Sequence, residues 1–511
     1  MEETQPVRSI IEERIKKLKK LIELGIEPFA YHFERTHKIV EILQKFSKIK
    51  VGEIKKGKKV KVAGRIVALR IHGKAGFADI EDSSEKIQLY FKIDTIGEKL
   101  YNIFTKLLDI GDIISVEGFV FRTHKGELSV WVENFCILAK SLRPLPSKWY
   151  GLKDVELRYR QRYLDLIMNK EMRDRAILIS RIVNAMREFL IKRGFVEVET
   201  PALQTVYGGA FARPFETYHN FLKQKMYLRI APELYLKRLI VGGLEKVFEF
   251  AKCFRNESVD ATHNPEFTQI ELYQAYANYE DTMKLIEEMF YFVVKKVLGK
   301  NYIEYQGNRI KLKPPWRRVT MVDAIKKYGK IDVTKLSDKE LTVVAKENEV
   351  KGIRRGELIE GLFEKLAQPK LIQPTFITMF PADITPLAKR SKKNPGFTER
   401  YEGYIAGLEV CNGYTELNNP IEQFKRFKEE EELRKRVKKE LEYMPMDRDF
   451  VRALEFGMPP TSGVGIGVAR VLSLFTNTTS IKEVILFPAV SGREKIKTVA
   501  DMFPEVLKMF D

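Results

Sequence analysis

The spacing of apolar residues changes along this chain of 511 residues. Apolar residues at helical intervals come first, at Ile11, Ile15, Leu18 and Ile22. Ser9 with Glu12 has the spacing of a capping box, and Gly25 offers a helix stop. From Lys59 to about Leu142 the pattern becomes short alternating runs separated by Gly, Asp and Ser. This part of the chain predicts a helical extension followed by five strands of a small barrel, for which we expect an OB-fold.

The rest of the chain, after a linker that contains prolines, predicts a large domain of alternating helices and strands. We place the basic helical extension at 1–52, the barrel at 53–145, the linker at 146–170 and the large domain at 171–511. A lysine-rich helical insertion is expected at about 319–367. The predicted fold class is therefore α+β with several domains.

Two alternating runs in the large domain, 247–255 and 267–275, predict a long hairpin around a turn at Asn264 and Pro265. Period two places a polar and aromatic set on one face of this hairpin: Glu249, Ala251, Cys253, Arg255 and Glu257, then Phe267, Gln269, Glu271 and Tyr273. The opposite face is apolar, so the polar face is expected to line a ligand site. A solvent-facing hairpin with cross-strand ion pairs is the alternative that the same period allows.

Three glutamates, Glu402, Glu409 and Glu416, follow at intervals of seven residues. In a regular strand this odd spacing would alternate their faces, so turns or bulges at Gly407 and Gly413 are expected to reset the register. Paired carboxylates facing a triphosphate suit Mg²⁺, which prefers oxygen ligands. The later run PPTSGVGIGVARV supplies a glycine-rich strand that permits close approach of a ligand and leads into a helix.

The formal net charge is +19, and it favours a polyanionic partner such as nucleic acid. A lysine- and glutamate-rich surface typical of heat-adapted proteins is the alternative. Lysines crowd residues 45–61, which supports the partner. The first helix also has basic residues that would either bind phosphates or remain solvated: Arg14, Lys16, Lys17, Lys19 and Lys20.

Three cysteines lie far apart in the sequence and predict buried thiols rather than disulfides or a zinc site. No run approaches the roughly 18 to 20 apolar residues of a membrane helix, and the N-terminus has no apolar signal core. We therefore expect a cytoplasmic protein without a membrane span.

Several motifs together carry a family resemblance. FLIKRGFVEVETP, FRNES with HNPEFTQIELY, and GVGIGVARV resemble the three motifs of class II aminoacyl-tRNA synthetases, in order, and the barrel resembles their anticodon-binding domain. YGGAFARPF, MYLRIAPELYLKRL, ELYQAY and NGYTELN are similar to the lysyl branch, and the basic extension is similar to that of archaeal or eukaryote-like members. The resemblance implies a homodimer with an antiparallel catalytic sheet flanked by helices. It also implies activation of L-lysine with ATP and Mg²⁺ and its transfer to the 3′ end of tRNA(Lys).

The resemblance assigns roles to individual residues. Arg255 and Arg470 would be catalytic. Contacts to ATP would come from Arg255, Glu257, His263, Asn264, Phe267, Glu402, Glu409 and Arg470, with Mg²⁺ on Glu402 and Glu409. Lysine would be bound by Gly209, Glu233, Arg255, Glu271, Tyr273, Asn412 and Glu416. In the barrel, the anticodon would be bound by Arg70, Phe77 and Gln88.

The sequence departs from the family pattern at Ala469, because an acidic residue usually precedes the arginine of the third motif. We expect either altered ATP binding or support from Glu455. Together with the basic extension, this departure motivates the alternative of an RNA-binding paralogue without aminoacylation activity. The segment that begins VSGREK also extends past the usual end of the family.

Overall fold

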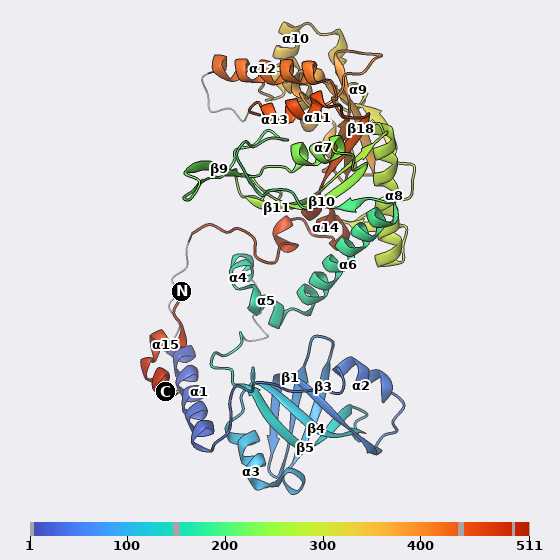
Figure 1. Cartoon of the computed structure of the whole chain (residues 1–511). Helices are drawn as coiled ribbons and strands as arrows, with labels where there is room; N and C mark the ends of the chain where they lie inside the picture. Colours follow the sequence, from blue (N-terminus) through green and yellow to red (C-terminus); the bar gives the residue numbers. More distant parts are fainter. Residues whose placement is uncertain (1–4, 147–153, 438–443, 493–495, 510–511) are drawn as a thin grey trace. The chain divides into compact units, whose positions relative to one another are not determined.

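The computed structural model describes residues 5–146, 154–437, 444–492 and 496–509 (Figure 1). The chain divides into two compact units. Unit 1 comprises Met1–Arg158, Tyr163–Met168 and Ser491–Asp511, and unit 2 comprises Tyr159–Arg162 and Asn169–Val490. Two short helices, α4 (Val155–Arg160) and α5 (Arg162–Met168), lie at the passage from one unit to the other.

Unit 1 is built around a closed five-stranded barrel with strand order β1-β2-β3-β5-β4. Its strands are β1 (Ile54–His72), β2 (Ala75–Glu81), β3 (Lys86–Lys92), β4 (Ile113–Arg122) and β5 (Leu128–Ala139). Helix α3 (Ile93–Lys106) follows β3, and α2 (Ile39–Lys45) precedes the barrel. Alternate residues such as Val60, Val62 and Val130 fill the barrel core. The predicted OB-fold barrel is confirmed.

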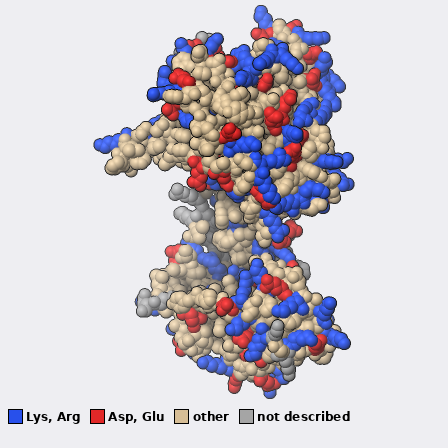
Figure 2. Space-filling model, turned by 45° about the vertical axis from the view of Figure 1, so that its right-hand side comes forward, with Lys and Arg blue, Asp and Glu red and all other residues tan. Residues whose placement is uncertain are grey.

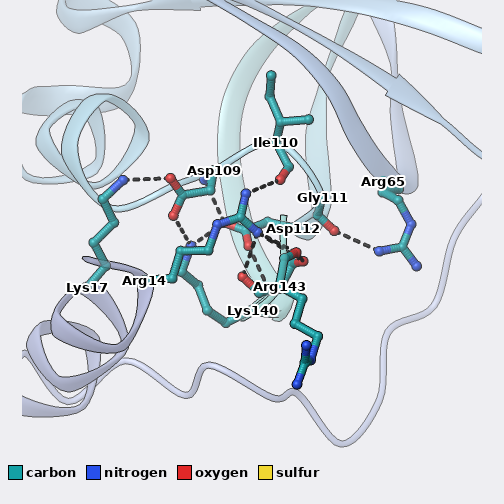
Figure 3. Close-up of polar contacts among 10 residues, drawn as sticks. Arg14, Lys17, Arg65, Asp109, Ile110, Gly111, Asp112, Lys140 and Arg143 are labelled. Atoms are coloured by element: carbon teal, nitrogen blue, oxygen red, sulfur yellow. Dashed lines mark hydrogen bonds and ion pairs between the residues drawn. The ribbon is translucent and has the colours of Figure 1, made fainter. Parts of the chain in front are cut away.

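Helix α1 (Gln5–Glu23) is fixed to the barrel by buried polar contacts (Figure 3). Arg14 Nη1 donates to the carbonyls of Ser141 and Arg143 at 2.9 Å, and Nη2 donates to Ile110 O at 2.8 Å. Lys17 Nζ lies 2.6 Å from an oxygen of Asp109. Two of the five basic residues that the sequence analysis singled out in this helix, Arg14 and Lys17, are therefore bonded to the barrel and its flanking chain. The predicted capping box is wrong, because Ser9 lies inside the helix.

The end of the chain belongs to unit 1, although the sequence prediction assigned it to the large domain. Helix α15 (Val499–Met502) and the 3-10 helix η5 (Pro504–Met509) lie in this segment. Phe503 and Val506 pack against Ile11 and Ile15 of α1, and the guanidinium of Arg8 lies 5.4 Å from the Phe503 ring centroid. The apolar face of α1 is thus covered by residues almost 500 positions away along the chain.

Unit 2 contains an eight-stranded sheet with strand order β14-β15-β16-β17-β18-β11-β10-β6. In that order its strands are Arg317–Thr320, Thr375–Pro381, Phe397–Ile405, Leu408–Thr415, Thr461–Gly467, Glu266–Ala275, Lys246–Phe254 and Val196–Glu197. Only the pairs β14–β15 and β10–β6, at the two edges of the sheet as described, are parallel. The predicted antiparallel sheet with flanking helices is confirmed.

Helices cover both faces of this sheet (Figure 1). One face packs against α6 (Lys170–Lys192), α8 (Tyr279–Leu298) and α14 (Val468–Thr476) in a large apolar core. On the other side, α7 (Glu233–Val241), α12 (Pro420–Val437) and α13 (Arg448–Glu455) form a smaller core with β10 and β11. A third core contains the helical insertion, with α9 (Met321–Gly329), η1 (Val333–Lys335), α10 (Asp338–Glu347), α11 (Arg355–Leu366) and η2 (Gln368–Lys370).

The remaining elements of unit 2 are short. A small sheet of order β7-β9-β8 comprises Leu203–Gln204, Gln224–Leu228 and Glu216–His219. A two-stranded sheet comprises β12 (Tyr302–Tyr305) and β13 (Asn308–Lys311). Two further 3-10 helices are η3 (Ala382–Ile384) and η4 (Ile481–Glu483).

Charged residues are mixed on the surface, and two of the three cysteines are buried. On the visible face of each unit, lysine and arginine side chains are spread out and interspersed with acidic ones (Figure 2). Cys253 and Cys411 are buried as predicted, but Cys136 is exposed, because it lies on an outward position of β5. No helix in the described part of the chain is long and apolar enough to cross a membrane.

Candidate active site and nucleic-acid interface

A cavity of about 420 Å³ lies against the polar face of the central strands of unit 2. It is lined by residues of β10, β11, β16, β17, β18, α7 and α14 and by the loops between them. Every residue predicted to bind ATP or lysine lines this cavity except Glu416. Residues that the resemblance assigned to one site, although they span more than 250 positions of the chain, therefore lie around one cavity in the structure.

The predicted hairpin is confirmed and forms one wall of the cavity. Strands β10 and β11 pair antiparallel, with Glu249 opposite Glu271 and Cys253 opposite Phe267. The guanidinium of Arg255 lies 5.1 Å from the Phe267 ring centroid, within the range of a cation–π contact. Arg255 Nε is buried and has no hydrogen-bond partner among the described residues. Since a buried donor without an acceptor is costly, this arginine is suited to bind an anion that enters the cavity.

The turn of the hairpin is held by its own polar groups. Asn264 donates to Glu266 O at 2.6 Å and accepts from Ala489 N at 3.0 Å, so both ends of its amide are occupied by main chain. His263 is exposed and lies 2.9 Å from Asp260. The Thr262 backbone N–H, together with the Thr262 and His263 side chains, holds the pKa of Asp260 well below its usual range. The structure thus gives Asn264 a clear role in shaping the loop.

Three buried carboxylates and their partners form what we call the first carboxylate cluster: Glu233, Lys237, Glu271, Tyr273, Tyr414 and Glu416. Glu271 accepts from Gln269 Nε2 at 2.5 Å and from the Tyr273 hydroxyl at 3.0 Å. Burial, with Glu233 adding to it, raises the pKa of Glu271 to about 8. A cationic ligand beside Glu271 would therefore favour its ionised form at neutral pH.

Glu416 lies behind the wall of the cavity. Its Oε2 forms an ion pair with Lys237 Nζ at 2.5 Å, and apart from that ion pair neither of its two buried oxygens has a hydrogen-bond partner among the described residues. Gly463, which does line the cavity, lies directly beside Glu416. A Cβ at Gly463 would lie 2.7 Å from Glu416 Oε1 and 2.2 Å from the Tyr273 ring, so only glycine fits there.

A second carboxylate cluster comprises Arg400, Glu402, Tyr404, Glu409 and Arg470. Glu402 accepts from Arg400 Nη2 at 2.6 Å and from the Tyr404 hydroxyl at 2.5 Å. Burial raises the pKa of Glu402 to about 8, although Arg400 opposes the shift. The register is reset as expected by a turn at Gly407, but the bulge lies between Gly403 and Tyr404, and Gly413 is regularly paired.

The fit of this cluster to Mg²⁺ depends on a second source of ligands. Within the described ranges no group of three or more His, Cys, Asp or Glu side chains could hold a metal ion. Glu402 and Glu409 supply hard oxygens that suit Mg²⁺, and the phosphates of a nucleotide would have to complete the shell, as is usual for this ion. The donor set therefore fits a metal that arrives with a nucleotide.

Arg470 is held in place although Ala469 precedes it. Arg470 Nη1 donates to Glu409 Oε2 at 2.8 Å and to Glu409 O at 3.1 Å. Ala469 packs against the large apolar core of unit 2. The orienting carboxylate thus comes from the neighbouring strand β17, and no contact from Glu455 is needed.

Some residues of the site were missed by the sequence prediction. Lys237 follows Glu233 by four residues on α7, so helical spacing could have identified it. Tyr414 shares strand parity with Asn412 on β17, and its hydroxyl donates to Glu233 Oε1. Arg400 shares strand parity with Glu402 on β16, so the same argument could have identified it.

The outer surface of the barrel carries a row of aromatic rings. Phe77 pairs across strands with Arg70 on one side and Tyr90 on the other, and Tyr90 pairs with Trp131. The ring centroids of Phe77 and Tyr90 are 5.0 Å apart, and those of Tyr90 and Trp131 are 4.9 Å apart. Arg70 is held by Asp79 at 2.8 and 3.2 Å, and Gln88 donates to Glu127 at 3.0 Å. Such a row of partly exposed rings with polar groups beside it is suited to stacking unpaired bases.

Comparisons with known proteins agree with both sites. Residues 154–491 match the family described as tRNA synthetases class II (D, K and N), and residues 60–138 match the OB-fold nucleic acid binding domain. The chain is 50% identical over 486 residues to a lysine–tRNA ligase of Moorella thermoacetica, covering 94% of this chain and 98% of the relative. It is 51% identical over 500 residues to that of Carboxydothermus hydrogenoformans, covering 96% and 100%. It is 50% identical over 494 residues to that of Clostridium botulinum strain Loch Maree, covering 95% and 96%.

Proposed function

Because this chain belongs to the class II tRNA synthetases and, within them, to the lysine–tRNA ligases, we propose that its first carboxylate cluster binds L-lysine and its second binds ATP. One observation carries this assignment. A single cavity joins a group of buried carboxylates to two arginines, Arg255 and Arg470, and to the aromatic ring of Phe267.

Lysine brings a side-chain ammonium, which needs anionic and hydroxyl partners when it is removed from water. Glu416 Oε1 and the Tyr273 hydroxyl provide them. Glu233, with Gly209 beside it, receives the α-amino group; a Cβ at Gly209 would lie 2.8 Å from Glu233 Cβ, so glycine keeps this place open. Glu271 and Asn412 complete the lining around lysine.

ATP has a complementary set of partners. Phe267 stacks on the adenine, and Arg255 and Arg470 bind the phosphates, with Glu257, His263 and Asn264 in the loop that surrounds them. Mg²⁺ would be held by Glu402 and Glu409 and would neutralise phosphate charge when bound. Because the pKa of Glu402 is raised, binding of the cation is expected to release a proton from this residue.

The reaction proceeds in two steps. A carboxylate oxygen of lysine attacks the α-phosphorus of ATP, the bond to the β-phosphate oxygen breaks, and pyrophosphate leaves. A hydroxyl of the terminal ribose of tRNA then attacks the carbonyl carbon of lysyl-adenylate, and AMP leaves. The carboxylate is already ionised at neutral pH, so the first step requires no protein base. Arg255 instead brings the carboxylate and the α-phosphate together and balances the growing negative charge.

The direct test is ATP–pyrophosphate exchange with each of the twenty amino acids, followed by charging of tRNA transcripts. We expect exchange with lysine and charging of tRNA(Lys). Exchange that does not depend on lysine would refute the assignment. The alternative of an inactive RNA-binding paralogue loses the ground that Ala469 gave it, because Arg470 is oriented by Glu409.

The lysine assignment is tested by Glu416→Gln, which removes the charged partner of the substrate ammonium. We expect kcat/KM for lysine to fall about 30-fold or more, with KM for ATP nearly unchanged. Glu287→Gln is the matched control, because Glu287 is buried on α8 and accepts from Trp316 N at 2.7 Å outside the cavity. Equal effects of the two substitutions would contradict the assignment.

We further propose that the aromatic row of the barrel binds the anticodon of tRNA(Lys), with Phe77 stacking on a base and with Arg70 and Gln88 bonding to its edge. The archaeal or eukaryote-like affiliation remains a prediction, since the three relatives compared are bacterial. The cytoplasmic location also remains a prediction.

A homodimer is proposed from the exposed apolar residues on the helix and strand of the first motif. Ile177 and Ile191 on α6 and Val196 on β6 are each about half exposed. β6 is an edge strand, and such edges invite pairing. Light scattering should give twice the mass of the chain, and Ile191→Asp should shift the protein toward monomer. A monomer at every concentration would refute the dimer.

A further inference from the structure

Lys237 has no assigned role in the site, yet its environment is unusual. Its side chain is 1% exposed on α7, one turn after Glu233. A lysine ammonium is rarely buried so fully unless it is paired. Here it has two carboxylate partners and three aromatic neighbours.

The two carboxylates come from different elements. Lys237 Nζ lies 2.5 Å from Glu233 Oε1 on its own helix and 2.5 Å from Glu416 Oε2, which follows strand β17. The ammonium therefore joins the residue proposed to bind the α-amino group to the residue proposed to bind the side-chain ammonium. No other described residue forms an ion pair with either carboxylate.

Aromatic rings surround the same ammonium. Its nitrogen lies 5.3 Å from the ring centroid of Tyr414, 5.7 Å from that of Phe450 and 5.9 Å from that of Tyr273. Ring faces attract a cation and exclude water from it. Burial alone lowers the pKa of Lys237, but Glu233 and Glu416 outweigh burial, so the pKa is raised and the side chain remains charged.

Each carboxylate keeps one oxygen that Lys237 does not use. Glu233 Oε1 receives both Lys237 and the Tyr414 hydroxyl, and its Oε2 faces Gly209 at the cavity wall. Glu416 Oε2 faces Lys237, and its Oε1 is buried beside Gly463 without a hydrogen-bond partner among the described residues. The two remaining oxygens are the ones that can meet a substrate.

We propose that Lys237 is a positioning residue for the substrate: its ammonium fixes one oxygen each of Glu233 and Glu416 and directs the other two toward the two ammonium groups of lysine. This inference rests on the proposed assignment of the lysine site. Lys237 itself does not touch the substrate. It sets the spacing and the charge of the two carboxylates before lysine arrives, so less reorganisation is required on binding.

The charge balance explains why this cation is needed. Glu416 is faced by Lys237 and Glu233 from α7, by Glu271 and Tyr273 from β11 and by Tyr414 from β17. Burial and the two other glutamates raise the pKa of Glu416, and Lys237 is the group that opposes them. Without Lys237, Glu416 would hold its proton to higher pH and offer no charge to the substrate.

Three substitutions test this role in lysine-dependent pyrophosphate exchange. Lys237→Met removes the ammonium, Lys237→Gln keeps a hydrogen-bond donor without charge, and Lys237→Arg keeps the charge. We expect the Met and Gln variants to raise KM for lysine about 30-fold or more, with KM for ATP and kcat at saturating lysine changed much less. The Arg variant should recover most of the loss.

Two further measurements distinguish positioning from a purely structural role. The pH at which lysine binding reaches half its maximum should move upward in the Met and Gln variants and stay near the wild-type value in the Arg variant. Discrimination between lysine and norleucine, the analogue that lacks the side-chain amino group, should shrink in the same two variants. If Lys237 had only a structural role, the substitutions would lower kcat, kcat/KM for lysine and kcat/KM for ATP together, and would change neither the pH profile nor the discrimination between lysine and norleucine. That result would overturn the proposal.

The design also separates this inference from the site assignment. If Glu416→Gln raises KM for lysine but Lys237→Gln, shown to be folded by circular dichroism, does not, the role of Lys237 is refuted and the lysine site stands. If Glu416→Gln leaves KM for lysine unchanged, the site assignment fails and the inference fails with it. If Lys237→Met does not fold, the Gln and Arg variants decide the question.

Discussion

Two lysines of this protein, Lys140 in unit 1 and Lys237 in unit 2, are both buried between two carboxylates. Lys140 Nζ lies 2.6 Å from Asp109 and 2.8 Å from Asp112, and its side chain is fully buried. The distances around Lys237 are nearly the same. Burial, residue type and ion-pair geometry therefore do not distinguish the two places.

Hydrogen-bond saturation does distinguish them. Asp112 Oδ1 accepts from Ser141 N and Oδ2 from Asp109 N, each at 2.8 Å, and Asp109 receives Lys17 as well (Figure 3). Every carboxylate oxygen of that pair is therefore occupied, and the cluster fastens α1 and the chain beyond β5 to the barrel. Around Lys237, by contrast, an oxygen of Glu416 has no hydrogen-bond partner among the described residues. A saturated cluster is suited to a structural role, whereas the unsaturated one beside the cavity is the cluster that we propose to bind lysine.

The strongest way to break this comparison is Lys140→Met. Removing the cation leaves Asp112 buried without its counter-ion, so the free energy of unfolding should fall by about 3–5 kcal/mol. Denaturation by urea, with hydrogen exchange of the barrel strands, would measure this loss. In the fraction that stays folded, KM for lysine in pyrophosphate exchange should not change.

The matched control for that substitution is Lys365→Met, because Lys365 forms an ion pair with Glu349 at 2.7 Å on the surface. Its removal should cost no more than about 1 kcal/mol. If Lys140→Met and Lys365→Met lowered the free energy of unfolding equally, buried and exposed ion pairs would not differ in their contribution to stability in this protein.

The proposed anticodon site of unit 1 is the aromatic row on the outside of the barrel, and Phe77→Ala tests it. Loss of one stacking ring should weaken binding of tRNA(Lys) by about 1–3 kcal/mol. Filter binding or KM for tRNA would measure the effect, while pyrophosphate exchange without tRNA should remain unchanged. Tyr31→Ala is the control, since Tyr31 is 97% exposed and stands outside the aromatic row. Equal weakening by both variants would remove the aromatic row as the binding surface.

Much of the fold and of the site was predictable, because it follows from local periodicity. Period two identified the hairpin and placed Arg255, Phe267 and Glu271 on one face; strand pairing confirms the hairpin, and all three residues line the cavity. Resemblance to a known family then supplied the partners on β16 to β18. These predictions succeeded where a side chain's direction is set by its own strand.

The failures concern contacts between distant parts of the chain. Arg14 and Lys17 looked like phosphate-binding residues, but their acceptors lie at 109 to 143 and become visible only in the folded barrel. The packing of Phe503 on α1 could not be foreseen for the same reason. Helical spacing could have linked Lys237 to Glu233, but nothing in the sequence indicated that Glu416, 179 residues further along the chain, would contact Lys237 as well.

The buried carboxylates beside the cavity should also reduce stability until a cationic ligand binds, and Glu271→Gln tests this. The folded pKa of Glu271, raised by burial to about 8, lies above its ordinary value. The ionised form is therefore penalised in the folded state, and the cost grows as pH rises from the ordinary value toward 8. Without lysine, Glu271→Gln should stabilise the enzyme at pH 8 by about 1 kcal/mol or more, and less at pH 5. Thermal unfolding at both pH values measures the difference, and an equal effect at both would contradict it.

In the saturated cluster, replacing a carboxylate by an amide should lower stability instead of raising it, and this is the smallest of the predicted effects. Burial raises the pKa of Asp109, but Lys140 and Lys17 outweigh it, so the pKa lies below its ordinary value. Asp109 therefore contributes stability that is complete above the ordinary pKa and is lost as pH falls through the folded pKa. Asp109→Asn should reduce stability at neutral pH by about 1 kcal/mol, since Asp112 still pairs with Lys140, and should flatten the loss of stability in acid. Unfolding of wild type and variant from pH 7 to pH 3 measures both slopes. If the unfolding free energy of wild type and variant fell equally steeply with pH, the ion pairs of Asp109 would not govern stability in acid. The difference from Glu271 would then have to be explained by burial alone.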